Sequence, residues 1–371
     1  MGKRNRTQGH QQGKPVLQTI VLTAVSFVGV LLVLVLAHEF GHFITAKLSG
    51  VTIQEFGIGF PPRLLSFKRG ETIYSLNAIP LGGFTKLLGE EDPTLAGSLA
   101  SKSIPIRFLV LGAGSLMNIL LPIFLFSIAF MIPHDMLLET VQVEEVAPNS
   151  PAQSAGIEAG DTVLEINNRP IENRSDVGYI IHLNLSSEVN ILLQKADLSQ
   201  EEVSVKPRWN PPQGEGAIGI VIMGTDSVVV RESCPIWEAV PSGIRHCWEI
   251  LILFRNEVIS WFVRGTAPQL TGPVGISELT GQVAKAGLSP LLEFAALISI
   301  NLAIINLFPF PGLDGGRLVF VALEWVRRGK RISPKKEGLV HLIGFIVLIL
   351  LIAAISYYDI ARIVQGESLL P

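Results

Sequence analysis

Long apolar runs alternate with polar segments along this chain, and four of the runs are long enough to cross a membrane. They cover residues 16–48, 104–132, 290–316 and 339–358. Each contains roughly the 20 apolar residues that a helix needs to span the hydrocarbon core of a bilayer. The pattern therefore predicts an α-helical polytopic membrane protein with four transmembrane helices.

A fifth apolar stretch, residues 236–265, differs because polar side chains interrupt it. They are Glu238, Arg245, His246, Glu249, Arg255 and Glu257. This mixture is too polar for a membrane span and is typical of amphipathic helices that lie in the membrane interface. We expect interfacial amphipathic helices here.

Basic residues beside the spans predict the side of the membrane on which each connection lies. Lysines and arginines are frequent in the connections 49–103 and 317–338. These connections follow the first and the third span, so both lie on the same side of the membrane. Because basic connections are usually cytoplasmic, we expect this side to be the cytoplasm. The segment between the second and third spans is then extracytoplasmic. The basic N-terminal tail, residues 1–15, disagrees, because it would also lie outside. We give the two connections more weight. A C-terminal tail, residues 359–371, follows the last span.

The connection 49–103 has the pattern of folded structure. It contains VTIQEFGIGFPPRLLSFKRGETIYSLNAIPLGGFTKLLGE, in which short alternating stretches are separated by Gly and Pro. Such a pattern predicts β-hairpins. Its apolar content indicates that it dips against the membrane, where paired strands satisfy the backbone. We expect a cytoplasmic, membrane-associated β-hairpin region, and a plain basic loop at 317–338.

The segment 139–210 has the pattern of short strands around a helix. Its stretch APNSPAQSAGIEAGDTVLEINN resembles a PDZ domain, which implies one extracytoplasmic α+β domain. PDZ domains bind an extended peptide as an added strand. The alternative is a spacer that merely caps the site.

Composition supports the membrane assignment and excludes other classes. Charged residues make up 16% of the chain, against about 25% in soluble domains. The net charge of −3 argues against nucleic-acid binding. The two cysteines, Cys234 and Cys247, form neither a disulfide framework nor a CxxC zinc motif, so we expect them to pack as apolar residues.

The first apolar run ends in AHEFGH, which places His38, Glu39 and His42 within a predicted span. Helix positions i and i+4 share a face, so both imidazoles can reach one Zn²⁺ ion. In HExxH sites the glutamate is the general base toward the attacking water. Polar groups inside a membrane span are costly and usually functional, which argues against a chance match.

Catalytic zinc needs a third protein ligand and an open position. Asp314, in NLAIINLFPFPGLDGGRL, lies at the inner end of the third apolar run and would complete a His₂Asp site. The prolines and glycines of this stretch would unwind the helix and open space near the metal. The alternative is that Asp314 only caps a helix in a polar turn.

Together these motifs resemble the site-2 protease family of intramembrane zinc metalloproteases. The resemblance rests on AHEFGHF, IPLGGFTKLLGE, TGPVGI at 271–276 and NLFPFPGLDGG. A single PDZ-like segment between the second and third spans is similar to bacterial members of the regulator of sigma-E protease type. Members with the longer arrangement have two PDZ domains, so the subgroup stays open.

The resemblance implies a role for each residue of the motifs. His38, His42 and Asp314 would be the zinc ligands, and Glu39 the base.

Two further features are implied to contact substrate. Asn306 would orient the substrate near the metal, and the hairpin around Gly57, Ile58 and Gly59 would pair with it as an added strand. For Asn306 the alternative is an ordinary hydrogen bond between membrane helices.

The implied function is a zinc endopeptidase of the bacterial inner membrane that cleaves single-span proteins, such as anti-sigma factors or signal-peptide remnants, in regulated intramembrane proteolysis. Besides the lipid bilayer, its partners would be these substrates and an upstream site-1-type protease, and the PDZ domain would recognise or gate trimmed substrates. Two other functions stay open: an inactive membrane scaffold, which has no need of the metal triad, and a zinc transporter, which needs more polar residues along a membrane path.

Overall fold

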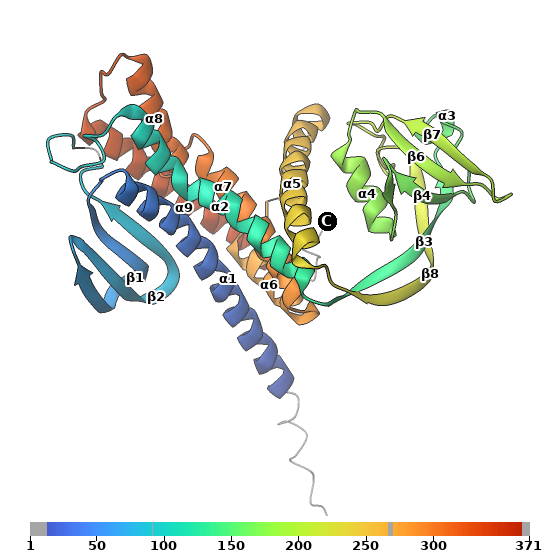
Figure 1. Cartoon of the computed structure of the whole chain (residues 1–371), viewed down its shortest axis with the longest axis horizontal. Helices are drawn as coiled ribbons and strands as arrows, with labels where there is room; N and C mark the ends of the chain where they lie inside the picture. Colours follow the sequence, from blue (N-terminus) through green and yellow to red (C-terminus); the bar gives the residue numbers. More distant parts are fainter. Residues whose placement is uncertain (1–12, 91, 266–269, 366–371) are drawn as a thin grey trace, which may run out of the picture. The chain divides into compact units, whose positions relative to one another are not determined.

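The computed structural model describes residues 13–90, 92–265 and 270–365 (Figure 1). The chain forms two compact units. The first unit runs to Ala129 and resumes at Leu270, and the second lies between these positions. The N-terminal tail that the sequence predicts at 1–15 lies almost entirely outside the described residues.

In the described part of the chain, four helices are long and apolar enough to cross a membrane, which agrees with the number of candidate spans in the sequence. They are α1 (Gly13–Leu48), α2 (Ile104–Met131), α7 (Leu288–Leu307) and α9 (Pro334–Gln365). The most apolar stretch of α2 is 44% buried within the protein, whereas that of α9 is 6% buried. Helix α2 is therefore packed more deeply within the protein, and α9 leaves most of its apolar surface exposed.

The third span ends earlier than predicted. Helix α7 stops at Leu307, and a separate helix α8 (Asp314–Val326) begins at Asp314. Pro309 and Pro311 lack a backbone N–H, and Gly312 has a φ of +98°, so the chain turns between the two helices.

Two segments predicted as loop or tail are helical. The expected basic loop at 317–338 is helical at both ends, because residues 317–326 belong to α8 and residues 334–338 to α9. Val321 of α8 is buried in the same core cluster as Phe43 and Val110. Helix α9 continues past 358, where Asp359 Oδ2 accepts a hydrogen bond from Gly275 N at 2.8 Å. Gly275 lies in the first turn of α6 (Pro273–Ala286), so the buried carboxylate holds α9 against α6.

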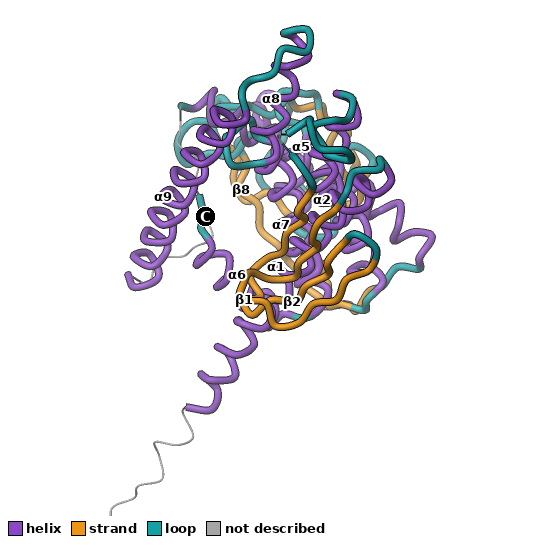
Figure 2. The backbone as a smooth tube through the Cα atoms, turned by 90° about the vertical axis from the view of Figure 1, so that its left-hand side faces the viewer, coloured by secondary structure: helices purple, strands orange, loops and turns teal. Residues whose placement is uncertain are grey.

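The β-hairpin region consists of two long, bent strands, β1 (Ile53–Arg69) and β2 (Thr72–Leu87), drawn in orange in Figure 2. Because both strands bend, β1 pairs with β2 along more than one stretch, and residues 55–58 of β1 have a partner on each side. Residues 55–58 pair with 83–86 on one side and with 73–76 on the other, and residues 63–69 pair with 72–77. The result is a sheet of four segments, with residues 83–87 at one edge and residues 63–69 at the other.

Aromatic packing joins this sheet to α1. The ring of Phe43 on α1 lies 5.1 Å from that of Phe56 and 6.0 Å from that of Tyr74, measured between centroids. Thr85 Oγ1 donates a hydrogen bond to the backbone oxygen of Glu39 at 3.0 Å. The sheet is thereby fixed beside the HExxH turn.

The second unit contains an antiparallel sheet whose strands lie in the order β7-β6-β4-β3-β8, and the short strand β5 pairs with β4. Its strands are β3 (His134–Val146), β4 (Thr162–Ile166), β5 (Arg169–Pro170), β6 (Val189–Gln194), β7 (Gln200–Val205) and β8 (Ile220–Glu232), and its shorter helices are α3 (Pro151–Ser154) and α4 (Arg174–Leu183). The predicted domain end at 210 is too early, because β8 pairs with β3 from His134–Glu232 to Val146–Ile220.

The predicted amphipathic helices at 236–265 form one helix, α5 (Ile236–Arg264). Pro241 lies near its start and does not divide it. On one side, Asn256 Nδ2 donates to His182 O at 2.7 Å, and Glu249 accepts from Tyr179 at 2.9 Å. Apolar residues such as Trp248 are exposed on α5, as the amphipathic pattern predicts.

Candidate metal centre

The two histidines of α1 point their ring nitrogens at each other one helical turn apart. The side chains of His38 and His42 are buried, each with 8% residual exposure. Their Nε2 atoms lie 3.2 Å apart. The i, i+4 spacing thus produces the shared face that the sequence predicts.

Asp314 joins this pair from the first residue of α8. Its Oδ2 lies 3.1 Å from His38 Nε2 and 3.2 Å from His42 Nε2. A carboxylate in the first turn of a helix is favoured by the helix dipole. The structure therefore brings the three predicted ligands together, although 272 residues separate His42 from Asp314.

The spacing of the three atoms fits a zinc ion. Tetrahedral zinc with bonds of 2.0–2.1 Å has ligand atoms about 3.3 Å apart. The observed separations of 3.1–3.2 Å are close to this. Two imidazoles and one carboxylate also leave one of four positions open, which is the pattern of catalytic zinc.

Each histidine is held through its other ring nitrogen, as metal-binding histidines usually are. His42 Nδ1 donates to Val110 O at 2.8 Å, which leaves Nε2 free as a ligand atom. His38 Nδ1 faces Asn118 Nδ2 at 3.3 Å, while the buried Asn118 Oδ1 has no hydrogen-bond partner. Turning the Asn118 amide by 180° makes Oδ1 the acceptor of the His38 Nδ1–H, which gives this oxygen a partner.

Asn118 and its neighbour on α2, Gly114, are site residues that the sequence analysis missed. A Cβ on Gly114 would lie 2.7 Å from His38 Nε2 and would also overlap His42 Nε2. Only glycine therefore lets α2 approach the two imidazoles. The available signals were a polar residue inside an apolar span and the small residues Gly112 to Ser115, a composition typical of close helix packing.

Glu39, the predicted base, is half-buried beside the three ligands. It lies within electrostatic range of His38, His42 and Asp314. A Cβ on Gly83, in the edge segment of β2, would be 3.5 Å from Glu39 Cγ. The carboxylate therefore lies between the ligand group and the edge of the sheet.

Of the predicted substrate contacts, Asn306 lies at the site and the hairpin contact needs correction. Asn306 Nδ2, near the end of α7, is 3.5 Å from His38 Nδ1. Gly57 and Ile58, in contrast, already have strand partners on both sides. Gly59 is buried, and its oxygen accepts from Asn77 Nδ2 at 3.0 Å. An added strand has no free edge at Gly57 and Ile58, because β1 and β2 pair twice.

Comparison with known proteins decides the family. The profile of peptidase family M50 matches residues 26–351. The chain belongs to peptidase family M50. A putative zinc metalloprotease of Clostridium acetobutylicum is 34% identical to this family member, over 88% of this chain and 94% of that protein. The zinc metalloprotease RasP of Oceanobacillus iheyensis is 30% identical, over 92% of this chain and 99% of that protein.

Among solved structures, the PDZ domain of an SdrC-like protein from Listeria monocytogenes is 24% identical to part of this M50 member. The match covers 23% of this chain and 88% of that domain, with a TM-score of 0.21.

Membership in family M50 confirms the resemblance to the site-2 proteases and the prediction of an enzyme. The predicted zinc cofactor agrees with the names of the relatives and with the His-His-Asp group. A peptidase family also favours the enzyme over the scaffold and the transporter.

Proposed function

We propose that this member of family M50 is an intramembrane zinc endopeptidase that cleaves the transmembrane segments of single-span proteins. One observation carries the proposal: three metal-binding side chains meet beside a glutamate, on and next to helices apolar enough to span a membrane. When bound, zinc acts as a Lewis acid on the peptide carbonyl and lowers the pKa of water.

The side chains have separate tasks in this reaction. His38, His42 and Asp314 would hold the zinc. Glu39 takes a proton from the attacking water and passes it to the leaving nitrogen as the peptide bond breaks. Asn306, 3.5 Å from His38, would donate a hydrogen bond to the substrate backbone near the reacting carbonyl.

The substrate segment has to be extended for this attack, because a transmembrane helix hides its carbonyls in internal hydrogen bonds. The outer edge of β2 at residues 83–87 suits this task. No strand in the described part of the chain pairs with that edge, and Gly83 lies beside Glu39. An extended substrate would add to this edge as a further strand, in place of the contact first expected at Gly57 to Gly59.

The wider setting is part of the same proposal. The basic connections favour a topology in which the hairpin region would lie on the cytoplasmic side of a bacterial cell membrane and the sheet of the second unit outside. There the PDZ-like domain would gate or recognise substrates already trimmed by an upstream protease. Anti-sigma factors and signal-peptide remnants are the substrate classes that fit a single short span.

Metal content and cleavage, measured on the same preparations, test the proposal. The purified chain is compared with Glu39→Gln, His38→Ala and Asp314→Ala, using a single-span test protein in detergent. We expect Glu39→Gln to keep its zinc and lose cleavage by at least about 100-fold. His38→Ala and Asp314→Ala should lose both zinc and cleavage.

Exposed Glu202 on β7 provides the matched control, since Glu202→Gln removes one carboxylate of the second unit, which contains none of the ligands. It should keep zinc and cleavage. Unchanged cleavage in Glu39→Gln, or full zinc and cleavage in Asp314→Ala, would show that these residues do not form the active site.

A further inference from the structure

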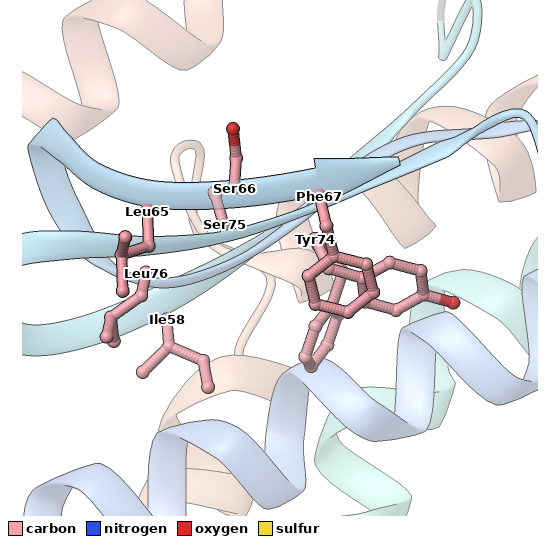
Figure 3. A pocket seen from close by; sticks show the side chains of 8 residues that line it. Ile58, Leu65, Ser66, Phe67, Tyr74, Ser75 and Leu76 are labelled. Atoms are coloured by element: carbon pink, nitrogen blue, oxygen red, sulfur yellow. The ribbon is translucent and has the colours of Figure 1, made fainter. Parts of the chain in front are cut away.

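One face of the hairpin sheet carries an apolar groove beside α1 (Figure 3). The strand register puts the side chains that line the groove on a common face, because directly paired residues point to the same side of a sheet. One row across the sheet consists of Ile58, Leu76 and Leu65, and the next consists of Phe56, Tyr74 and Phe67. In Figure 3 these side chains gather on one side of the sheet, whereas Ser66 points to the other. The cavity they line has a volume of about 440 Å³, within the range of small-ligand sites.

The far part of this groove is open. Leu65 is 68% exposed and Phe67 64% exposed, although both are large apolar side chains. Near α1 the same face is closed by Phe43, which contacts Phe56 and Tyr74. The segments 63–69 and 72–77 therefore extend beyond the helix and leave an uncovered apolar surface.

A cationic pocket continues the groove at Tyr74, which lines both cavities. This second cavity, of about 550 Å³, is bordered by Lys47 at the end of α1 and by Arg69 at the end of β1. Both side chains are exposed, and Lys47 Nζ lies 5.4 Å from the centre of the Phe43 ring. Glu71 is the one acidic residue among those lining this pocket, so the pocket is net positive.

We propose that the two cavities together bind one anionic phospholipid. Its acyl chain lies in the groove against Leu65, Phe67 and Leu76, and its phosphate lies between Lys47 and Arg69. The alternation along β1 supports this arrangement, because Leu65, Phe67 and Arg69 share one face and run from apolar to cationic. This site is separate from the proposed proteolytic centre and goes beyond that function.

The groove suits a hydrocarbon chain better than a peptide. It is a sheet face made of side chains, so it offers no backbone donors or acceptors. A peptide there would keep its own amides unsatisfied unless it stayed helical, whereas an acyl chain needs only apolar contact. The bound chain fills the space under residues 63–69 and 72–77 and supports the sheet against α1.

Native mass spectrometry of the full chain in detergent tests the site. The protein is titrated with dioleoylphosphatidylglycerol, dioleoylphosphatidylcholine and inorganic phosphate. We expect one saturable phosphatidylglycerol site that binds phosphatidylcholine at least tenfold more weakly. Because each basic residue near an anionic lipid contributes roughly fivefold, Lys47→Ala with Arg69→Ala should weaken phosphatidylglycerol about thirtyfold.

The matched control is Lys68→Ala with Lys86→Ala, which removes the same charge. Lys68 pairs with Ile73 and Lys86 with Glu55, so both lie on the opposite face of the sheet and should not affect binding. Leu65→Gln, at an exposed position, should weaken the lipid without unfolding the protein. Glu71→Gln should strengthen it.

Several results would overturn the proposal. Equal binding of the two lipids, or an equal loss in the Lys68 and Lys86 control, means that no anionic lipid site exists on this face. Inorganic phosphate bound as tightly as phosphatidylglycerol means an ion site without the groove. A polyleucine single-span peptide that displaces the lipid, and whose own binding depends on Leu65, assigns the groove to a peptide.

Discussion

At the scale of single residues, Gly114 and Asn118 on α2 determine whether the histidines of α1 can hold a metal. Neither is a predicted ligand. Gly114 provides the space in which the two Nε2 atoms meet, and Asn118 sets the ring orientation of His38. Two predictions follow from these separate roles.

Gly114→Ala should remove zinc binding while leaving the helices intact. The new Cβ would overlap Nε2 of both histidines, so the rings must turn away from Asp314. A displacement of about 1 Å is enough to lower cleavage by roughly 100-fold. The measurements are zinc content, cleavage and thermal unfolding. Gly112→Ala is the control, because its Cβ would have no neighbour within 4 Å. Full zinc content in Gly114→Ala would refute the steric role.

Asn118→Ala should weaken zinc binding by about 10- to 100-fold, the usual effect of losing the hydrogen bond behind a ligating histidine. Asn118→Asp keeps an acceptor facing His38 Nδ1 and should restore most of the affinity. Zinc affinity measured by competition with a chelator distinguishes the two variants. If alanine and aspartate weaken zinc equally, Asn118 only fills space and does not position His38.

At the scale of elements, α8 carries Asp314 and is itself held by a buried ion-pair network. Glu324 accepts from Arg107 of α2 at 2.6 Å and from Arg331 at 2.9 Å. Burial alone would raise the pKa of the Glu324 carboxyl, but the two arginines outweigh it and hold the pKa below its usual range. A depressed pKa stabilises the folded state above the unfolded pKa, and this contribution is lost as the pH falls through the folded value.

Glu324→Gln should therefore destabilise the protein at pH 7, by about 3 kcal/mol, because it leaves Arg107 buried without a counter-charge. The gap in melting temperature between wild type and variant should begin to shrink as the pH falls below about 4, the usual pKa of a glutamate in an unfolded chain. It should close only when the carboxyl of the folded wild type also protonates. Zinc content should fall in parallel if α8 shifts. Glu202→Gln, at an exposed position of β7, serves as control. A gap that is the same at pH 7 and at pH 3.5 would contradict the ion-pair explanation.

Elements with strong local signals could be predicted, and those defined by distant contacts could not. The four spans and the i, i+4 histidines follow from apolar length and helical spacing. The helical end of α9 depends on Asp359 meeting Gly275 N, 84 residues away, and β8 depends on pairing with β3 across the whole domain. The double pairing of β1 with β2, which closes Gly57 to a substrate strand, depends on where long strands bend. Alternation of residues does not encode this.

At the scale of the whole molecule, the sheet of the second unit is an insertion whose two ends meet. His134 at the start of β3 pairs with Glu232 at the end of β8, so their Cα atoms are about 5 Å apart. Residues 135–231 can therefore be removed and replaced by two glycines while α2 and α5 stay continuous with the rest. The shorter deletion 139–210, which follows the boundaries predicted from sequence, leaves about half of β8 without its β3 partners and should fold less well.

If the inserted sheet gates substrates by size, the deletion of 135–231 should widen what the enzyme cuts. The ligands, Glu39 and the β2 edge all lie outside the deleted stretch, so zinc content and cleavage of a single-span protein with a short extracytoplasmic tail should match wild type. A second substrate with a folded domain on that tail should be cut only by the deletion variant, because nothing then excludes it. Both substrates share one transmembrane segment, so any difference comes from the tail. If the deletion variant cleaves the short-tailed substrate normally but leaves the substrate with the folded domain uncut, the sheet does not act as a size filter. If the deletion instead lowers cleavage of the short-tailed substrate, the sheet takes part in substrate recognition.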